Sequence, residues 1–590
     1  MEQTGFKLNR KALFGVMVLA AAGGMPAQAA TINVTTTADV IADNGQCSLR
    51  EAVIAANTDT ASGATLGECV AGAGADTIVV PAGTYTLALA AASAVLPRVG
   101  TEEDWYEPSA GVDPYILGTD PNAAVGDLDL NASVTIVGDG IGQTIIDGGD
   151  LDRVFQIVAN PTNAAVTIDV TLSDLTVRNG FTNWVQITLP DVDGSYWLFK
   201  KAGGGIATGV AAAVTQYVPA VHGPGAGAGQ EQRRGSPGGE EEAGPTYGLT
   251  LTNVAIVDNV SEGDAGGLYN ITPMVASGLL VEGNRSDANG GGIYNEGSST
   301  ITNSTIRDNV AEGGGGLFAT GFNTVTISGT TINANRAVGG GAVSGRSNVI
   351  INVTNSTLSG NLARDVGAGF YHNGEANLTF VTVANNVAGA DAPAAGAGIN
   401  TFQSGSVDIG VKNVLVAANK KGWAGATDDS YKTDPIPQPG EAGFDTLTNA
   451  NCGTTGGGSP AITSAGYNLS SDTSCTVFNQ ATDINNVDPL IGALAPNGGP
   501  TQTHALLAGS PALSKGGVEA GITTDQRGEA RETPPDIGAY ELANVLPPVV
   551  VSGGGGGGCA VGGDGRLDPT LPAMLATALA FFGLRRRAGK

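Results

Sequence analysis

Short apolar runs alternate with polar and glycine-rich turns through the middle of the chain, and the pattern repeats every 25 or 26 residues. An asparagine marks each copy, and three positions before it lies an aliphatic residue that we expect to point inward from a short strand. The asparagines are Asn259, Asn284, Asn309, Asn335, Asn361 and Asn386, and the aliphatic residues are Ile256, Val281, Ile306, Ile332, Leu358 and Val383. So regular a period predicts one supersecondary unit repeated many times.

Glycine runs follow most of these asparagines and lead into an apolar pair, as in residues 266–270, 290–295 and 313–318. Glycines allow tight backbone corners, and the short apolar stretches have the length and β-branched content of strands. A leucine-rich repeat has a similar period, but its leucine signature is absent, and a helical repeat would not tolerate this much glycine. The pattern therefore predicts an all-β protein built on a parallel β-helix.

The repeated asparagines have a structural interpretation. Equivalent residues of neighbouring coils in a parallel β-helix stack at the strand spacing of roughly 4.8 Å. Their amide side chains can then form a ladder of hydrogen bonds along the coil. We expect this ladder to hold the scaffold together rather than to bind a ligand.

Three carboxylates, Glu262, Asp287 and Glu312, lie three residues after successive asparagines. The repeat places them on successive coils, where close carboxylate oxygens could bind a divalent cation such as calcium. Nearby arginines could neutralise them instead, and these are Arg285, Arg307 and Arg336. We take the three acidic residues as a candidate cation site, with no cofactor required, and we assign no catalytic residue.

The N-terminus has the pattern of an export signal. Basic residues precede an apolar run over residues 12–22, and Ala27 and Ala29 form an A-x-A cleavage site. The run is too short for a standard transmembrane helix. We therefore expect signal peptidase to remove residues 1–29.

Four of the five cysteines can pair by proximity in the oxidising compartment that export implies. The pairs are Cys47 with Cys69 and Cys452 with Cys475. Each pair would close a surface loop near one end of the solenoid, and Cys559 is left over.

The segment after Cys47 predicts a short helix. Ser48 and Glu51 have the spacing of a capping box, and the apolar residues that follow share one helical face. Such a helix could cover the open first coil, which would otherwise expose its core and an unpaired strand edge. We interpret Arg50 and Glu51 as polar residues of this end cap rather than as catalytic groups.

This segment, Cys-Ser-Leu-Arg-Glu-Ala at residues 47–52, resembles the N-terminal CSLREA domain of bacterial secreted proteins. Residues 75–87 and 147–155 look like the first coils of the pectin-lyase-like β-helix associated with it. The resemblance implies a right-handed β-helix and export, but it does not imply lyase activity. We assign residues 30–125 to the N-terminal cap and first coils, and residues 126–430 to the main β-helix.

Two insertions interrupt the repeat. One is acidic and lies between residues 100 and 125, and the other covers about 181–247 and includes a flexible stretch rich in Gly, Pro, Glu and Arg. Residues 203–206 within the second insertion could form one ordinary corner of the coil. Insertions on one flank of a repeat protein often bind partners, which makes their aromatic residues candidates for carbohydrate stacking: Trp105, Tyr106, Trp184, Tyr196 and Trp197.

A different pattern begins after residue 430. Motifs between residues 452 and 541 are similar to the choice-of-anchor Q domain, which precedes varied surface-anchoring signals. Dense Gly, Pro, Asn and Asp turns predict an irregular C-terminal cap over residues 431–545. His504 and Asp525 lie here without a nucleophile motif, so we expect them to be structural.

A linker rich in Pro and Gly over residues 546–558 precedes a tail over residues 559–590. The tail has an apolar run and a terminal basic cluster, and it resembles the JDVT-CTERM type of sorting tail, with Leu567, Asp568, Pro569 and Thr570 at the motif. The resemblance implies recognition by an intramembrane sorting protease and transfer to the cell surface. Proline replaces the motif's valine. Cys559 is the candidate for processing or lipid attachment.

Composition is consistent with an elongated solenoid. The chain has 590 residues, 91 of them glycine, only 14% charged residues and a formal net charge of −27. A protein this anionic is a poor nucleic-acid binder, and we expect a monomer.

Two functions from different classes fit the sequence. The first is a non-enzymatic adhesin or binding module for envelope or extracellular polysaccharide, held at the bacterial cell surface or outer membrane or released from it. The alternative is a polysaccharide lyase or glycoside hydrolase that uses the face bearing the insertions, although the sequence lacks the clustered Asp-Asp and His-Gly motifs of polygalacturonases.

Overall fold

The computed structural model describes residues 29–89, 123–158, 167–182, 184–188, 196–208, 212–215, 247–389, 396–402, 408–423, 431–455 and 462–543. For residues 184–201 and 212–215, only the backbone is described. The predictions for most of the export signal, the acidic insertion, the linker and the sorting tail concern residues outside the described ranges.

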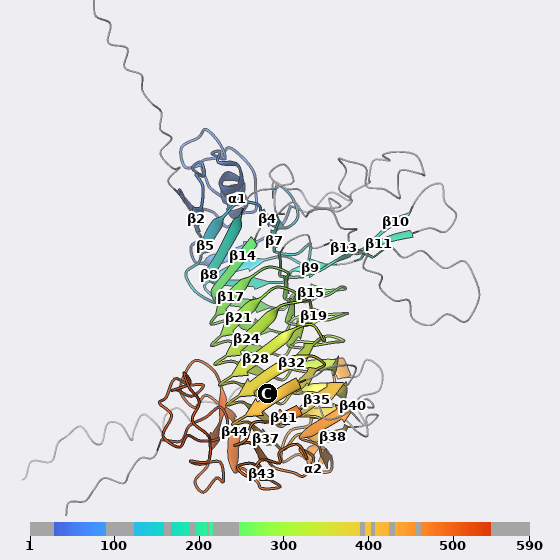
Figure 1. Cartoon of the computed structure of the whole chain (residues 1–590). Coiled ribbons are helices and arrows are strands. Elements are labelled where there is room, and N and C mark those ends of the chain that lie inside the picture. The colour runs from blue at the N-terminus through green and yellow to red at the C-terminus, as the bar shows by residue number, and fades with distance from the viewer. Residues whose placement is uncertain are drawn as a thin grey trace, which may run out of the picture. The chain divides into compact units, whose positions relative to one another are not determined.

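The described chain folds as a parallel β-helix, and each complete coil visits four faces in turn (Figure 1). In one coil, β17 (Met274–Ser277) lies on face 1, β18 (Leu280–Glu282) on face 2, β19 (Arg285–Ser286) on face 3 and β20 (Ile293–Asn295) on face 4. The next coil repeats this order, and its strands pair in parallel with those of the previous coil. The predicted fold class is confirmed.

Faces 1 and 2 belong to one 22-stranded sheet, and β8 (Ile168–Arg178) and β14 (Tyr247–Val257) extend over both. The other strands of face 1 are β1 (Thr31–Asn33), β2 (Asp76–Val79), β5 (Val134–Val137), β21 (Ser299–Thr302), β24 (Thr324–Ser328), β28 (Ile350–Thr354), β32 (Glu375–Thr379), β36 (Asp408–Lys412) and β41 (Ile462–Ser464). Those of face 2 are β3 (Gly83–Thr86), β6 (Thr144–Asp147), β22 (Thr305–Arg307), β25 (Thr331–Asn333), β29 (Thr357–Ser359), β33 (Thr382–Ala384), β37 (Leu415–Ala417), β42 (Leu469–Ser470) and β43 (Ile484–Asn485).

Face 3 consists of short strands, and face 4 is a ten-stranded sheet. Face 3 contains β9 (Phe181–Thr182), β15 (Val260–Ser261), β26 (Arg336–Gly339), β30 (Leu362–Val366), β34 (Val387–Gly389), β38 (Lys420–Trp423) and the antiparallel β39 (Thr448–Asn449). Face 4 contains β4 (Leu128–Leu130), β7 (Phe155–Ile157), β12 (Ile206–Thr208), β16 (Leu268–Asn270), β23 (Leu317–Ala319), β27 (Val343–Gly345), β31 (Phe370–His372), β35 (Ile399–Phe402) and β40 (Cys452–Thr455). The corner predicted at residues 203–206 is confirmed, because β12 pairs with β7 and β16.

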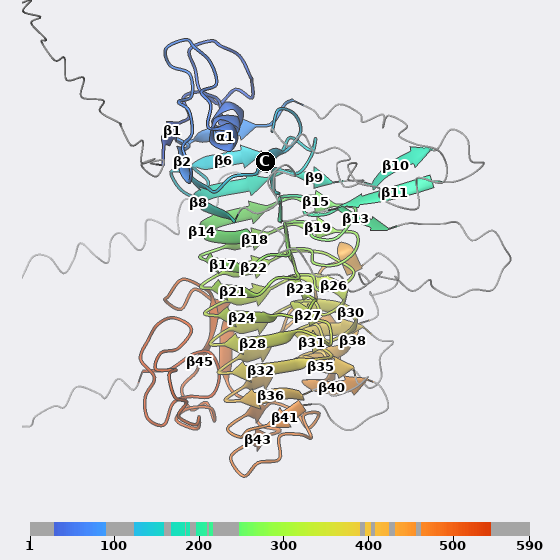
Figure 2. The same cartoon turned by 45° about the horizontal axis from the view of Figure 1, so that its top comes forward.

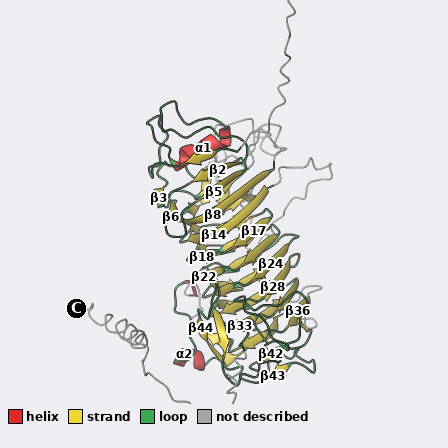
Figure 3. Ribbon diagram, turned by 90° about the vertical axis from the view of Figure 1, so that its left-hand side faces the viewer, coloured by secondary structure: helices red, strands yellow, loops and turns green. Residues whose placement is uncertain are grey.

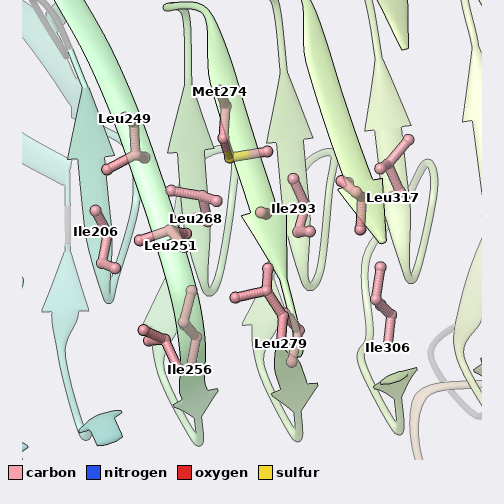
Figure 4. Packing of buried hydrophobic residues seen from close by; sticks show 14 of the residues in the cluster. Ile206, Leu249, Leu251, Ile256, Leu268, Met274, Leu279, Ile293, Ile306 and Leu317 are labelled. Atoms are coloured by element: carbon pink, nitrogen blue, oxygen red, sulfur yellow. The ribbon is translucent and has the colours of Figure 1, made fainter. Parts of the chain in front are cut away.

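One hydrophobic core runs through the inside of the coils. Its buried residues extend without a break from Ile32 near the first strand to Phe478 beyond the last coils. Alternation within each strand sends one side chain inward and the next outward, so Leu268, Ile293 and Leu317 stack on one another inside (Figure 4). Each coil therefore contributes a few aliphatic side chains, and burial accumulates by stacking coils.

The asparagine ladder predicted from the sequence is present and fully buried. Each amide nitrogen donates to the amide oxygen of the next coil, at 2.9 Å from Asn259 to Asn284, 2.9 Å from Asn284 to Asn309 and 2.9 Å from Asn309 to Asn335. The same oxygen also accepts a backbone N–H of the preceding ladder residue. The amide N–H and the amide oxygen thus both have hydrogen-bond partners within the protein, which a buried polar group requires.

The ladder is longer than the sequence pattern indicated. Asn386 donates to Asn419 at 2.8 Å, and Asn419 donates to Asn451 at 2.9 Å. Insertions between these coils hide the period, so the spacing rises to 33 and 32 residues. At its end, the backbone N–H of Asn451 donates to the carboxylate of Asp472 at 3.0 Å, which takes the place of a further asparagine.

Glycine is needed beside the ladder. A Cβ added to Gly267, Gly292 or Gly316 would lie about 3.0 Å from the side-chain amide of a ladder asparagine, too close for an ordinary contact. The residue before each ladder asparagine from Asn259 to Asn419 also turns the chain through positive φ, as at Asp258 and Asp308. The glycine runs and the asparagines therefore belong to one packing arrangement.

The predicted N-terminal helix is α1 (Leu49–Thr58), and Figure 3 shows it over the first coils. Its capping box is formed, because the backbone N–H of Glu51 donates to the Ser48 hydroxyl and that of Ser48 donates to the Glu51 carboxylate. Arg50 is fully buried and forms an ion pair with Asp39 at 2.6 Å. It also donates to the carbonyl oxygens of Ala123 and Gly126, so it fastens the helix to the loop before β4.

The C-terminal region, predicted as an irregular cap, has two parts. The loop that contains Cys475 and Phe478 closes the core after the last coils. The chain then turns back and forms the antiparallel pair β44 (Ile491–Ala495) and β45 (Thr503–Leu506) beside the coils (Figure 2). Hydrogen bonds to Thr331 and Thr357 place it against the outer side of face 2. We call residues 488–541 the flank segment. A short helix, α2 (Ala442–Asp445), lies before both parts, near the start of the region predicted as the cap.

We predict that Asn309→Ala lowers the free energy of unfolding by roughly 2–4 kcal/mol, because the amide and backbone N–H groups of Asn284 would lose a buried acceptor. Urea denaturation of the mature chain measures this change. Asn377→Ala is the matched control, since it removes an asparagine pair with Asn352 that is exposed, and it should change stability by less than about 0.5 kcal/mol. Equal losses in the two variants would contradict a special role for the buried ladder.

Candidate functional site

The predicted acidic column lies on successive coils just after face 3. The amide N–H of Asp287 donates to the previous coil at Ser261, and that of Glu312 donates to Ala288, which fixes the register. Glu262 is half-buried, whereas Asp287 and Glu312 are exposed. Asp287 pairs with Arg285 at 3.0 Å. Across the described ranges, no group of three or more His, Cys, Asp or Glu residues is placed to hold a metal ion, so the calcium site stays a prediction from the sequence.

Two of the arginines expected to neutralise this column have other partners. Arg307 forms an ion pair with Glu282 at 2.8 Å on face 2. Arg336 donates to the carbonyl oxygens of Tyr431 and Asp434, and burial lowers the pKa of its guanidinium. The sequence interleaves all three arginines with the acids, but Arg307 and Arg336 are drawn to Glu282 and to the later segment at residues 431–434, and only Arg285 pairs with an acid of the column.

The aromatic residues proposed for carbohydrate stacking are only partly within the described chain. Trp105 and Tyr106 lie outside it. Trp184 begins β10 (Trp184–Thr188), and Tyr196 and Trp197 begin β11 (Tyr196–Lys201), which pairs with β10 and β13 (Ala212–Thr215) in a small antiparallel sheet. Trp184 lies opposite Lys200, and Trp197 lies opposite Ile187.

A second aromatic group, which the sequence reasoning missed, lies on the outer side of face 4. Tyr269 and Tyr294 stack with ring centroids 5.1 Å apart, and Tyr294 and Phe318 stack at 5.3 Å. The sequence contained the signal for this group. The three aromatic residues directly follow Leu268, Ile293 and Leu317, which point inward, so alternation along a strand makes the aromatic side chains point outward. The rings cover one another's faces and are no more than 9% exposed. Burial, with Glu296 nearby, raises the pKa of Tyr294. The stack therefore stiffens the coil.

Exposed aromatic rings occur at the edge between face 4 and face 1. Phe322 lies in the turn between β23 and β24 and is 90% exposed. Phe402 is the last residue of β35 and is 41% exposed. Their coils are three steps apart, which corresponds to roughly 14 Å along the axis. We call this pair the aromatic edge. Neither ring is covered in the way that the Tyr269 stack is covered, so a ligand could lie against both.

His504 and Asp525 are structural, as expected. His504 is 2% exposed and lies between the Ser359 hydroxyl at 2.8 Å and the carbonyl oxygen of Gly492 at 2.7 Å. Since a carbonyl can only accept, Nδ1 carries the proton and Nε2 accepts from Ser359. Asp525 pairs with Arg527 at 2.8 Å. The His504 contact with Ser359 holds the flank segment against face 2, whereas the Asp525 ion pair lies within that segment.

The cysteine pairing predicted from proximity is confirmed. Cys47 and Cys69 form one disulfide and Cys452 and Cys475 the other. All four belong to the continuous core, near its two ends. Cys559, Leu567, Asp568, Pro569, Thr570 and Ala27 lie outside the described residues, and Ala29 is the first described residue. The described part contains no helix long and apolar enough to cross a membrane.

No protein-family model matches the chain, and no curated protein matches it. Among solved structures, the chain is similar to the crystal structure of pectate lyase Pel9A, at 12% sequence identity and a TM-score of 0.29, over 88% of this chain and 97% of that one. A similarity this weak carries no argument about activity, and the assignment of the β-helix rests on the strand pairings themselves.

We predict that two buried histidines, His504 and His372, make stability depend on pH below neutrality. Burial lowers the pKa of His504 and of His372, so the folded state favours their neutral forms. As pH falls below about 6.5, the unfolded chain takes up protons that the folded chain resists, and the free energy of unfolding decreases by up to about 1.4 kcal/mol per pH unit for one proton.

Urea denaturation between pH 7.5 and 5.5 measures this slope. His504→Gln should reduce the slope, whatever its effect on stability at pH 7.5, because one of the two buried imidazoles is gone. An identical slope in the variant would show that His504 titrates alike in both states.

Proposed function

We propose that the protein is an exported, surface-anchored β-helix that binds envelope or extracellular polysaccharide without turning it over. The observation that carries the proposal is the aromatic edge, where Phe322 and Phe402 are exposed on the same edge of the β-helix, on coils three steps apart. The apolar C–H face of a sugar ring can cover an exposed phenyl ring and remove its surface from water.

The scaffold beneath the aromatic edge favours binding. Phe322 lies two residues before β24, and that strand is paired on both sides, with β21 and β28. The turn is further held by Asn323, whose amide donates to the carbonyl oxygens of Glu296 and Thr320. A preformed rigid surface loses little conformational entropy when a ligand binds.

Several features support export and anchoring. Two disulfides are compatible with an oxidising extracellular compartment. The signal at residues 1–29 and the tail at residues 559–590 have the composition of export and sorting segments. Signal peptidase and an intramembrane sorting protease would then act on the two ends during maturation, with Cys559 as the candidate processing site.

A glycan array with the mature chain tests binding. Phe322→Ala and Phe402→Ala should each weaken binding about tenfold, because each removes one stacking ring worth roughly 1–1.5 kcal/mol. Leu66→Ala is the matched control, since Leu66 is 97% exposed in the N-terminal loop, and it should leave binding unchanged. If the mature chain bound no glycan at all, the proposal would fail.

Turnover is tested separately. We expect no release of product from uronate polymers by the purified mature chain. Release that is abolished by Asp287→Asn would instead support the lyase or hydrolase alternative, with the acidic column as its site.

A further inference from the structure

Face 1 presents two outward columns that are unlike the rest of the surface. The strand register aligns the first column across eleven coils as Thr77, Thr135, Thr171, Thr250, Val275, Thr300, Thr326, Asn352, Asn377, Gly410 and Thr463. The second column, two residues further along each strand, is Val79, Val137, Ser173, Thr252, Ser277, Thr302, Ser328, Thr354, Thr379 and Lys412. Fourteen of these 21 positions are Ser or Thr and carry a hydroxyl group, seven in each column.

The two columns are open and almost free of charge. Every position is partly or fully exposed. Lys412 is the one charged residue among the 21, and it pairs with Glu519 at 2.5 Å. Three outward acidic residues of the same strands, Asp169, Glu375 and Asp408, lie to the side, ahead of the first column. Asp76 of β2 is buried, and Asp174 of β8 follows the second column, where it accepts from the Asn253 amide at 2.6 Å. In a chain with a formal net charge of −27, this is a neutral strip of hydroxyl and methyl groups.

Threonine hydroxyls on another face of this protein have observed hydrogen-bond partners. On face 2, Thr331, Thr357 and Thr382 form an equivalent column in register. The Thr331 hydroxyl donates to the carbonyl oxygen of Gln502 at 2.6 Å, and the Thr357 hydroxyl donates to the side-chain oxygen of Gln526 at 2.6 Å. The flank segment is thus held along the coil by uncharged hydrogen bonds to successive threonines.

Thr382 completes the pattern by accepting the backbone N–H of Ala539 at 3.0 Å. A threonine column on this scaffold can therefore both donate to and accept from an uncharged polar chain laid against it. Face 1 carries the same chemistry over more coils, and within the described residues the flank segment covers face 2 instead.

We propose that face 1 binds an uncharged, hydroxyl-bearing polysaccharide laid against its two hydroxyl columns. This inference rests on the proposed function and narrows it to one ligand class and one face. The columns repeat roughly every 4.8 Å between coils and every 6.6 Å within a strand, so many weak hydrogen bonds can act together on one polymer. Phe322 and Phe402 border the same face and add the apolar contact.

The charge of the protein favours a neutral polysaccharide over an acidic one. An acidic polysaccharide would meet no cation on the two columns other than the paired Lys412. It would also be repelled by the strongly negative protein. A neutral glycan avoids both costs.

The test compares two triple variants of the mature chain. Thr252→Val, Thr300→Val and Thr326→Val together remove three face 1 hydroxyls while keeping side-chain shape. Thr84→Val, Thr86→Val and Thr305→Val make the same change on face 2, at positions that are also exposed or partly exposed. Affinity electrophoresis in mixed-linkage glucan, galactomannan or polygalacturonate, together with retention on microcrystalline cellulose, measures binding, and urea midpoints confirm folding.

We expect the mature chain to be retained by at least one neutral glycan, and the face 1 variant to lose at least tenfold in affinity, with the face 2 variant within twofold. Equal affinities of the two variants would overturn the assignment to face 1 while polysaccharide binding stood. Retention by polygalacturonate alone would overturn the neutral ligand class. Retention by none of the polymers would overturn this inference, and a glycan array without any binding would in addition overturn the proposed function.

Discussion

The buried hydrogen bonds between ladder asparagines are the constraint on which the rest of this structure depends. An amide sealed inside a coil must find its partners in the protein, and here each finds them in the coil above and the coil below. A shift of one residue would place neighbours such as Gly283 or Arg285 where Asn284 lies, and the amide partners would be lost. The ladder therefore sets the register of every coil from Asn259 to Asn451, and with it the direction of every outward side chain.

The same requirement explains the ends of the solenoid. A stack of coils leaves open hydrogen bonds and apolar surface where it stops. At the C-terminal end, Asp472 accepts the last ladder N–H, and Asp483 does the same for Asn468 at 2.9 Å in a neighbouring column. At the N-terminal end, α1 covers the core and Arg50 ties it to the following loop. Each end also carries a disulfide whose two cysteines belong to the core.

A fixed register allows different faces to take different chemistry. The outer side of face 4 stacks aromatic rings, face 2 holds the flank segment, and the corner after face 3 carries charge. Face 1 keeps hydroxyl and methyl groups in two straight columns. The faces can differ in surface chemistry because alternation within a strand separates inward from outward residues, so the outer surface can vary without disturbing the core.

The sequence by itself determined the features that depend on spacing along the chain. The 25-residue period gave the parallel β-helix and the ladder, the Ser48 to Glu51 spacing gave the capped helix, and proximity gave both disulfides. It also pointed to the acidic column, but not to how its neighbours are used, because Arg307 and Arg336 look equally available until the strands and the segment at residues 431–434 are in place.

Only the tertiary structure decided which repeated positions are covered. Thr331 and Thr357 are covered and Thr300 and Thr326 are open, although all four occupy outward strand positions in neighbouring repeats. The difference arises from Gln502 and Gln526, about 170 residues away from the threonines they contact. Whether an outward residue is buried depends on whether a segment distant in the sequence packs against it. The residue pattern around the strand does not contain that information.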